Sequence, residues 1–441
     1  MRQWTRRAGV TATAVGLAGV LSLSASVLSQ PPLEPLRTAD GAASAVLAGR
    51  AELTSGVPAL QERLQRLPED WNAWAELGSA YLTQAQLTAD PTYYARAQEA
   101  YARSLAIRGE DNAPALTGQA TLAASRHDFT AALELGKRAQ LLNPYSASAH
   151  GVLVDALMEL GRYDEAATEL QRMVDLRPDV ASFTRVSYYR ELTGDLDGAR
   201  AALQQAGRFA FSPHDSAYVE RYLGELAFNA GDLETAEEHY EAGLRQVPGS
   251  PRLLAGRAKV KAAAGATDAA LEDYREATAR LPEPGYLIAY GELLEAVGRQ
   301  DEAREQYAVV DAVEMLFRAE GANPDLELSL YAADHSRPQA ALQMAERAWS
   351  VRRSIHTEDA YAWALHANGR HREALEHALE AERLGGANAL FAYHRGMIEQ
   401  SLGMYVEAKA SLARSLAINP HFSPLQVPVA EQTLTQLQAQ S

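Results

Sequence analysis

A period of about 34 residues runs through most of this 441-residue chain and constrains its fold more than any other feature. The clearest marker is an alanine that recurs ten times with spacings of 33 to 38 residues, at Ala97, Ala132, Ala166, Ala199, Ala236, Ala270, Ala303, Ala341, Ala374 and Ala408. Glycines keep step with it at Gly161, Gly194, Gly231, Gly265, Gly298, Gly369 and Gly403. A sustained period of this length indicates a repeat array.

Each unit of the array reads as two helices joined by a short turn. In the third unit, HGVLVDALMEL (residues 150–160) carries apolar residues at helical spacing, and Gly161 turns the chain. The second helix, DEAATELQRMVDL (residues 164–176), is stopped by Pro178. Small side chains on the facing sides let the two backbones approach closely. The sequence therefore predicts an all-α fold of about ten helix-turn-helix units.

The stretch WAELGSAYL resembles the start of the tetratricopeptide repeat. Trp74, Leu77, Gly78 and Tyr81 match the pattern W-x2-L-G-x2-Y without a gap. The fifth unit repeats much of the consensus, with Leu223, Gly224, Ala236, Tyr240 and Pro248. This resemblance covers roughly residues 71–420 and implies a right-handed superhelical solenoid whose concave face is lined mainly by first helices.

Composition and spacing divide the chain into six segments. The second helix of the seventh unit is expected to run on through VDAVEMLFRAEGANPD, and the array is divided there. The segments are a signal peptide or membrane anchor (1–30), a flexible tether (31–56), an N-terminal capping half-repeat (57–70), units 1–7 (71–310), units 8–10 (311–421) and a C-terminal capping helix (422–441). Capping helices close the ends of a solenoid against water.

The first thirty residues predict export. Arg2, Arg6 and Arg7 form a positive start, and residues 8–29 carry no charge before Pro31. This pattern is typical of a secretory signal, with a cleavage site after Ser29, although the stretch is also long enough to span a bilayer as an anchor. Either form places the array outside the cytoplasm. Abundant arginine and scarce lysine favour a bacterial source with a GC-rich genome.

Several functional classes find no support in the sequence. The net charge of −16 and the absence of a basic stripe argue against nucleic acid as a partner. The chain has no cysteine, which excludes thiol catalysis and cysteine-based metal sites. Nucleophile, phosphate-loop, dinucleotide and zinc-protease motifs are all missing. We therefore expect no enzyme activity, no cofactor and no metal site.

The expected function is to bind another protein or peptide in the concave groove. The family resemblance implies which positions face that groove, and these positions are rich in aromatic residues with an arginine among them, the types that dominate protein recognition. The predicted groove residues are Tyr188, Tyr218, Arg221, Phe228, Asn229, His356, Trp363, His366 and Tyr393. Replacing Trp363 and Tyr393 by alanine is expected to abolish binding and leave the helices intact.

A second reading of the same features remains open. If the N-terminal segment stays in the membrane as an anchor, the array would hold client proteins for an envelope assembly machine of the export or cytochrome-maturation type. An extracytoplasmic scaffold with a cleaved signal is the first reading. The position of the mature N-terminus separates the two.

Overall fold

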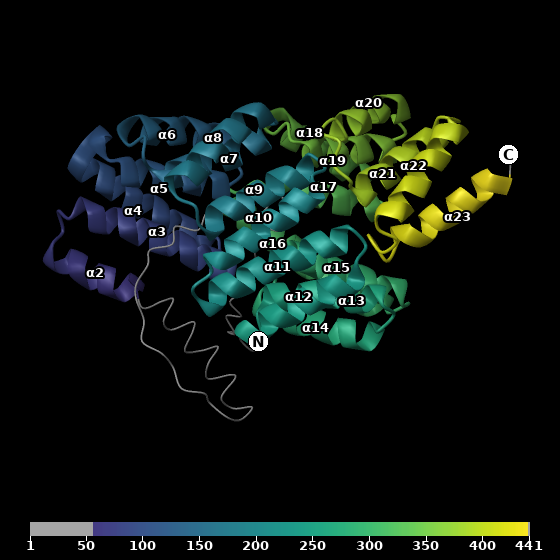
Figure 1. The fold of residues 1–441 in the computed structure, drawn as a ribbon, viewed down its shortest axis with the longest axis horizontal. Coiled ribbons are helices and arrows are strands. Elements are labelled where there is room, and N and C mark those ends of the chain that lie inside the picture. Colours follow the sequence, from purple (N-terminus) through teal and green to yellow (C-terminus); the bar gives the residue numbers. More distant parts are fainter. Residues whose placement is uncertain (1–55, 440–441) are drawn as a thin grey trace, which may run out of the picture.

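The computed structural model describes residues 56–439, and within that range every regular element is a helix (Figure 1). Single helices lie at the two ends, α2 (Gly56–Arg66) and α23 (Gln426–Ala439), and one 3-10 turn, η1 (Gly109–Asp111), follows α4. Between them lie ten helix pairs: α3 (Trp71–Thr88) with α4 (Thr92–Arg108), α5 (Ala113–Ser125) with α6 (Phe129–Leu142), α7 (Ala147–Glu159) with α8 (Tyr163–Leu176), α9 (Val180–Leu192) with α10 (Leu196–Arg208), α11 (Pro213–Asn229) with α12 (Leu233–Gln246), α13 (Pro251–Ala263) with α14 (Thr267–Arg280), α15 (Pro284–Ala296) with α16 (Gln300–Ala319), α17 (Asp325–Asp334) with α18 (Pro338–Val351), α19 (Ile355–Ala367) with α20 (His371–Ala381), and α21 (Ala389–Ser401) with α22 (Tyr405–Ile418). The all-α array of ten units predicted from the sequence is confirmed.

The recurring small residues have the roles that their spacing indicates. All ten alanines of the period are completely buried where the two helices of a unit meet. The seven turn glycines all have positive φ, between 71° and 83°. In the other three units the same turn position is taken by Ala89, His127 and Ser336, with φ between 58° and 62°. One left-handed residue therefore ends the first helix of every unit, and glycine adopts this conformation with least strain.

The segment boundaries agree with the sequence only in part. The first capping helix begins at Gly56, next to the expected position. The second helix of unit 7 is extended as expected, but α16 continues to Ala319, so the boundary placed after residue 310 falls inside it. The predicted signal segment, and the tether up to residue 55, lie outside the described residues. Within residues 56–439, no helix combines the length and hydropathy needed to cross a bilayer.

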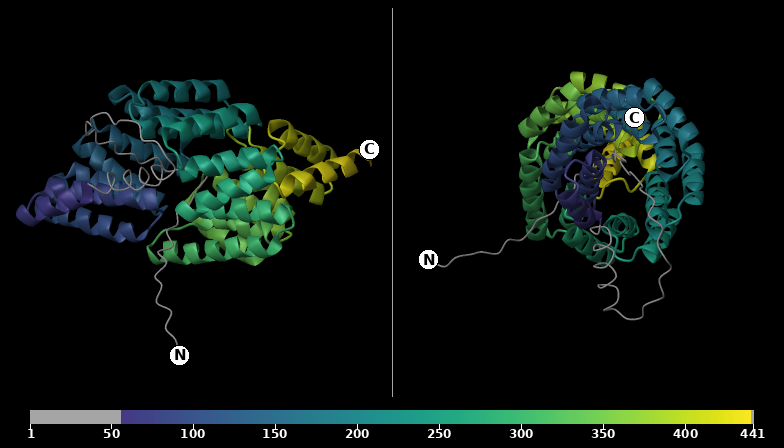
Figure 2. Two further views of the ribbon diagram at one scale, coloured as in Figure 1. Left: turned by 90° about the horizontal axis from the view of Figure 1, so that it is seen from below. Right: turned by 90° about the vertical axis from the view of Figure 1, so that its left-hand side faces the viewer.

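The ten units wind into a superhelix whose second turn lies directly against the first, so that the helices form a ring in the right-hand view of Figure 2. The turns inside units 2 to 5 meet the loops that follow units 7 to 10, and the bonded residues are 191 to 197 positions apart in sequence. We call this contact the seam. It consists of residues 126–128, 159–163, 192–194 and 228–231 on the first turn, and residues 320–323, 352–355, 385–386 and 418–420 on the second.

Direct hydrogen bonds join the two sides of the seam. Three of them are Asn323 N to Arg126 O at 3.1 Å, Arg353 N to Glu159 O at 3.1 Å, and Asn419 Nδ2 to Phe228 O at 2.8 Å. The hydroxyl of Tyr163 also accepts a bond from the backbone nitrogen of Ile355 at 2.9 Å. The seam therefore satisfies backbone groups at the turns and loops of both layers.

Arg352 is the buried charge at the centre of the seam. Its side chain is 3 % exposed and donates from Nη2 to Glu159 Oε2 at 2.7 Å. Its guanidinium carbon lies 5.0 Å from the ring centre of Phe129. A second carboxylate, Glu327, lies 3.9 Å from Arg352 Nη1, but neither of its buried oxygens accepts a hydrogen bond. Two carboxylates thus share one guanidinium, and burial raises the pKa of Glu327 to about 7, with Glu159 and Asp325 adding to the shift and Arg352 opposing it.

We expect Glu327→Gln to reduce the loss of stability as the pH rises. Between pH 4.5 and 7 the unfolded chain releases the Glu327 proton while the folded chain keeps it, so folding becomes less favourable as the pH rises. An amide carries no such proton. The urea midpoint of the parent protein should therefore fall more between pH 5 and pH 8 than that of the variant.

His127 and His356 also lie near Arg352, and their titration affects the stability of both proteins in this experiment. Burial and Arg352 lower the pKa of each to about 4, so their contribution to stability falls as the pH drops from 6.5 to 4. They are present in both proteins, and their effect cancels in the difference. If the urea midpoints of the two proteins changed with pH in parallel, the pKa of Glu327 would not be raised in the folded protein, and the prediction would be wrong.

Candidate binding surface on the concave face

A pocket of about 300 Å³ lies across the first helices of units 1, 2 and 3. Its walls are formed mainly by α3, α5 and α7, which lie in the purple and blue part of Figure 1. The lining residues are Ser79, Leu82, Thr83, Tyr101, Ala113, Pro114, Thr117, Gly118, Thr121, Asn143, Ser146, Ser148, Gly151, Val152, Met173, Arg177 and Arg185. The pocket therefore lies on first helices, which the family resemblance places on the concave face.

Two glycines make room for a tyrosine ring at the base of this pocket. Tyr101 of α4 is completely buried, and its ring passes between Gly78 of α3 and Gly118 of α5. A Cβ atom at either glycine would overlap the ring. The Tyr101 hydroxyl reaches Ser79 Oγ at 3.2 Å. The glycines let neighbouring helices close over the tyrosine, which positions the hydroxyl-bearing walls above it.

The walls present hydroxyl oxygens as hydrogen-bond acceptors. Ser79, Thr83, Thr117 and Thr121 each donate to the backbone carbonyl four residues earlier, at 2.9 to 3.2 Å. Each proton is thereby used within its own helix, and the oxygen keeps its lone pairs for other donors, of which the Tyr101 hydroxyl is one at Ser79. Backbone N–H groups of an extended peptide are donors of this kind.

The charges at the other end of the pocket are already paired. Arg185 is buried and donates to both oxygens of Asp155, at 2.8 and 2.7 Å. Burial raises the pKa of Asp155 to about 6, although Arg185 opposes this shift. Arg177 Nε lies 2.7 Å from Asp179 Oδ2. The pocket is thus close to neutral in charge, which suits a peptide backbone better than a strongly charged ligand.

The predicted groove residues of units 4 and 5 lie on first helices, as expected. Tyr188 is on α9, and Tyr218, Arg221, Phe228 and Asn229 are on α11. Tyr188, Tyr218 and Arg221 are partly buried, and Asn229 is exposed. Phe228 is only 6 % exposed and packs in the core between units, so its expected place in an open groove is wrong.

Asn229 and Phe228 also make contacts that explain their positions without a ligand. Asn229 Nδ2 donates to Glu191 at 3.0 Å. The ammonium of Lys259 lies 5.0 Å from the ring centre of Phe228 and 2.5 Å from Glu225. These contacts tie units 4, 5 and 6 together along the concave face.

The predicted groove residues Trp363 and Tyr393 are core residues, and the prediction that they line an open surface is wrong. Trp363 is 9 % exposed and donates from Nε1 to Asp334 at 2.8 Å. Tyr393 is 3 % exposed, and its ring centre lies 5.4 Å from that of Phe422. The C-terminal helix α23 contributes Ala430 and Leu437 to the same cluster, which covers the position where a groove was expected.

The predicted groove histidines are also engaged inside the protein. His356 lies at the start of α19, next to the seam and near Arg352, and its ring meets Phe391 edge-on at 5.3 Å. His366 stacks on Trp363 at 4.9 Å between ring centres. Burial, followed by His371 and His394, lowers the pKa of His366 to about 4, so this ring is neutral at physiological pH. Both histidines are partly buried.

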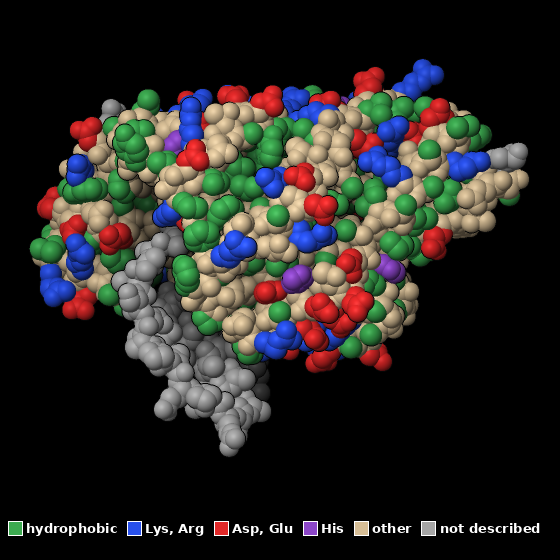
Figure 3. Space-filling model, viewed as in Figure 1, with side chains coloured by type: hydrophobic (Ala, Val, Ile, Leu, Met, Phe, Trp, Pro, Cys, Tyr) green, Lys and Arg blue, Asp and Glu red, His purple; other side chains and the backbone are tan. Residues whose placement is uncertain are grey.

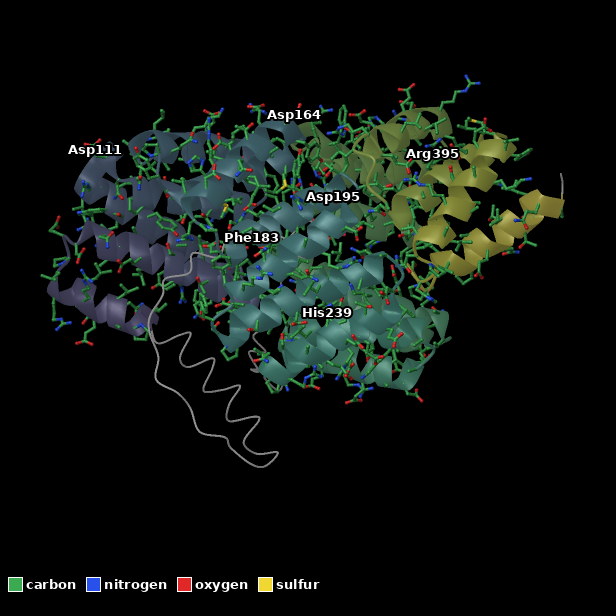
Figure 4. All side chains as sticks on the ribbon, in the orientation of Figure 1. Asp111, Asp164, Phe183, Asp195, His239 and Arg395 are labelled. Atoms are coloured by element: carbon green, nitrogen blue, oxygen red, sulfur yellow. The ribbon has the colours of Figure 1, made fainter. Side chains whose placement is uncertain are left out.

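Two further histidines each pair with one carboxylate. His239, labelled in Figure 4, lies 2.7 Å from Glu220, and His377 lies 2.6 Å from Glu358. No group of three or more His, Asp or Glu side chains in residues 56–439 is arranged to hold a metal ion. Lys and Arg are interspersed with Asp and Glu on the face seen in Figure 3, where no basic stripe is visible.

The sequence gives only a weak signal for the pocket of units 1 to 3, which has few aromatic residues in its walls. About half of its lining residues are Ser, Thr, Gly and Ala, which are also the residues expected where helices simply pack. A sequence signal exists, since Ser79, Thr83, Thr117 and Thr121 recur at intervals of four on first helices. Only the structure shows that these side chains face an open space rather than a neighbouring helix.

Comparison with known families gives two matches to this chain. Two sequence profiles described as tetratricopeptide repeat match residues 123–185 and 193–251. They cover the second helix of unit 2 through the start of unit 6 and agree with the helix pairs seen there. No curated protein sequence matches the chain.

Among solved structures, the chain is similar to several helical repeat proteins. A thermophilic TPR protein from Thermus thermophilus is 22 % identical, with a TM-score of 0.39, over 43 % of this chain and 98 % of that one. A tetratricopeptide repeat protein from Parabacteroides merdae is 17 % identical, with a TM-score of 0.35, over 59 % and 98 % of the two chains. Human IFIT1, solved as a dimer with PPP-AAAA, is 17 % identical, with a TM-score of 0.46, over 78 % of this chain and 82 % of that one.

Proposed function

We propose, from the premise that this chain is a tetratricopeptide-repeat protein, that it is a non-enzymatic scaffold which binds an extended peptide or helix of another protein. Tetratricopeptide repeats generally mediate protein–protein interactions, and proteins of this family are typically not enzymes. The binding surface in this proposal is the pocket across units 1, 2 and 3. The groove predicted around Trp363 and Tyr393 is not part of this surface, because both side chains are buried.

The observation that carries the proposal is the open, acceptor-lined pocket on three consecutive first helices. Its volume of about 300 Å³ lies at the lower end of the range for ligand pockets, ~300–1,000 Å³. A pocket of this volume can hold a short length of peptide chain. The hydroxyl oxygens of α3 and α5 offer acceptors to backbone N–H groups, while Leu82, Val152 and Met173 offer apolar contact. Binding through backbone groups and a few apolar side chains suits an extended segment.

We further propose that the scaffold works outside the cytoplasm. Support comes from residues 1–30 alone, with their arginine-rich start and uncharged stretch. The alternative of a membrane-anchored assembly factor differs only in whether this segment is retained. N-terminal sequencing of the native protein separates the two, because a start near Gln30 supports a soluble exported scaffold and an intact start in the membrane fraction supports the anchored form.

Filling the pocket tests the proposed site. Thr121→Trp combined with Ser148→Trp places two indoles in the pocket, and both positions are only partly buried, so the helix pairs should keep their packing. We expect the double variant to lose at least tenfold in affinity for partner segments that the parent protein retains. The measurement is capture from the native envelope fraction, identification by mass spectrometry, and titration with synthetic peptides of the captured protein.

A convex-face variant provides the matched control. Thr168 of α8 is exposed and, like Thr121, donates to the carbonyl four residues earlier, so Thr168→Trp adds an indole away from the pocket. This variant should bind like the parent protein. Equal binding by the parent protein and the pocket-filled variant, with normal circular dichroism for both, would refute the proposed site.

A further inference from the structure

The seam joins two kinds of edge, and each kind also occurs unpaired elsewhere in the molecule. In the seam, turns inside units 2 to 5 meet loops that follow units 7 to 10. The loops that follow units 2 to 4 form a free loop edge, and the turns inside units 6 to 10 form a free turn edge. The loop edge is residues 141–146, 176–179 and 209–212, and the turn edge is residues 264–266, 297–299, 335–337, 368–370 and 402–406.

An asparagine of the loop edge has the same place in its unit as an asparagine of the seam. Asn143 and Asn419 each lie eleven residues after the marker alanine and directly before a proline. Each side-chain oxygen accepts a bond from the backbone nitrogen two residues later, at 3.2 Å and 2.8 Å. Asn419 is 2 % exposed, and its Nδ2 donates across the seam to Phe228 O. Asn143 is exposed, and its Nδ2 donates to no other residue of the described chain. The loop edge therefore presents a seam donor without its acceptor.

Leucines of the loop edge correspond to a seam leucine in the same way. Leu142, Leu176 and Leu384 each lie ten residues after the marker alanine of their unit. Leu384 packs against a cluster that contains buried residues of both turns of the superhelix. Leu142 and Leu176 remain exposed. These two side chains therefore occupy a packing position of the seam without a layer to cover them.

The glycines of the turn edge show the other half of the same pattern. A Cβ atom at Gly161 would lie 2.2 Å from Arg353 O, and one at Gly231 would lie 3.1 Å from Ile418 O, so a loop backbone packs on these seam turns. At the turn-edge glycines, a Cβ atom would meet nothing within 4 Å beyond its immediate chain neighbours. These glycines are Gly265, Gly298, Gly369 and Gly403.

Exposed apolar side chains concentrate on the two free edges. Eight of the fourteen large apolar side chains that are exposed in the described residues lie there, although the edges are a small part of the chain. Such a concentration is typical of a surface that another protein covers. The eight are Leu141, Leu142, Tyr145, Leu176 and Phe211 on the loop edge, and Val297, Tyr405 and Val406 on the turn edge.

The two free edges belong to opposite ends of the molecule. Units 1 to 3 lie at one end of the long axis and unit 10 lies at the other (Figure 1). The ring in the right-hand view of Figure 2 is seen along this axis, so the superhelix winds from one end to the other. One molecule therefore cannot close its own loop edge onto its own turn edge, whereas a second copy can offer the missing edge.

We propose that the loop edge of one molecule docks on the turn edge of a second copy, so that molecules stack end to end along the superhelix axis. The partner is a second copy because the contact continues the seam, in which the same two kinds of edge already pack. This contact is heterologous and leaves one free edge of each kind, so association continues beyond two chains. The inference goes beyond peptide binding and does not depend on the pocket of units 1 to 3.

Sedimentation equilibrium of the full chain tests the proposal. The weight-average mass of the parent protein should rise with concentration and pass twice the 47.8 kDa of one chain. Leu141→Glu with Tyr145→Glu places two charges on the loop edge, and Tyr405→Glu with Val406→Glu places two on the turn edge. All four side chains are more than half exposed, so both variants should fold normally. Each variant alone should keep the mass of one chain.

A mixture of the two variants gives the decisive measurement. Each variant retains one intact edge, and these edges are complementary, so an equimolar mixture should form dimers and nothing larger. A variant that had failed to fold could not take part, and the mixture therefore also checks folding. The matched control is Met315→Glu with Leu379→Glu, because both residues are exposed on second helices away from the free edges. This control should associate like the parent protein.

Three results would overturn the proposal. The first is a parent protein that stays a single chain at every concentration. The second is a turn-edge variant that forms dimers by itself, because its loop edges would then pair with each other. The third is association that persists in both edge variants, because it would use another surface.

Discussion

Replacement of Arg352 by alanine is expected to lower the free energy of unfolding by about 3–5 kcal/mol. Arg352 is buried in the seam and bonded to Glu159, so its loss leaves a carboxylate buried without a partner. It also removes the cation that lies over Phe129 and the only charge opposing Glu327 at this point. Urea titration followed by circular dichroism measures the loss, and small-angle scattering should show a larger radius as the two turns separate.

The neighbouring residue gives a control for this experiment. Arg353 is exposed, and its side chain lies over Trp349 at 3.3 Å instead of in the charged centre of the seam. Arg353→Ala keeps its backbone bond to Glu159 and should cost only about 0.5–1 kcal/mol. The double change Arg352→Met with Glu159→Gln removes both charges and should recover much of the stability. A loss below about 0.5 kcal/mol in Arg352→Ala would mean that the two turns do not depend on this pair.

Trp363→Ala is expected to lower the free energy of unfolding by about 3–5 kcal/mol, because it leaves a large cavity. The indole is 9 % exposed, bonds to Asp334, and stacks on His394 with ring centres 4.1 Å apart. Its removal also uncovers the contact with α23. Chemical unfolding measures the loss, and peptide binding in the pocket of units 1 to 3 should be retained while the protein stays folded.

An exposed aromatic residue in the same part of the chain provides the control for the Trp363 variant. Tyr405, at the start of α22, is 52 % exposed, and Tyr405→Ala should change the stability by no more than about 0.5 kcal/mol. If Trp363→Ala instead abolished partner binding and left stability unchanged, Trp363 would be a groove residue after all and the buried cluster around it would be misplaced.

The local architecture could be predicted because it is encoded at short range. Ala166 lies within one helix pair and Gly161 ends the first helix of that pair, so sequence spacing alone identifies both roles. The same reasoning holds in every unit, where the alanine is buried and the turn residue is left-handed. The extended second helix of unit 7 was likewise readable from its uninterrupted helical pattern, although not its end at Ala319.

The long-range arrangement could not be predicted because it depends on small rotations that accumulate over many units. Nothing near Arg352 or Glu159 in the sequence indicates that they meet across 193 residues. The site assignment failed for the same reason. Trp363 and Tyr393 occupy positions that face the groove in an open superhelix, but here α23 covers them. Arg221, on the first helix α11, is only partly buried, and its Nε makes no hydrogen bond.

The seam also changes how this chain should fold and come apart. A linear repeat array is quasi-one-dimensional, so its ends can fray one repeat at a time and folding can start anywhere and spread. Here the turn of unit 3 is bonded to the loop after unit 8, and the turn of unit 5 to the loop after unit 10. Loosening one layer therefore removes partners from the other, which couples distant repeats into a single cooperative unit. The same contacts lie far apart in sequence, so the loop-closure entropy must be overcome before they form, and the ring should close late and slowly.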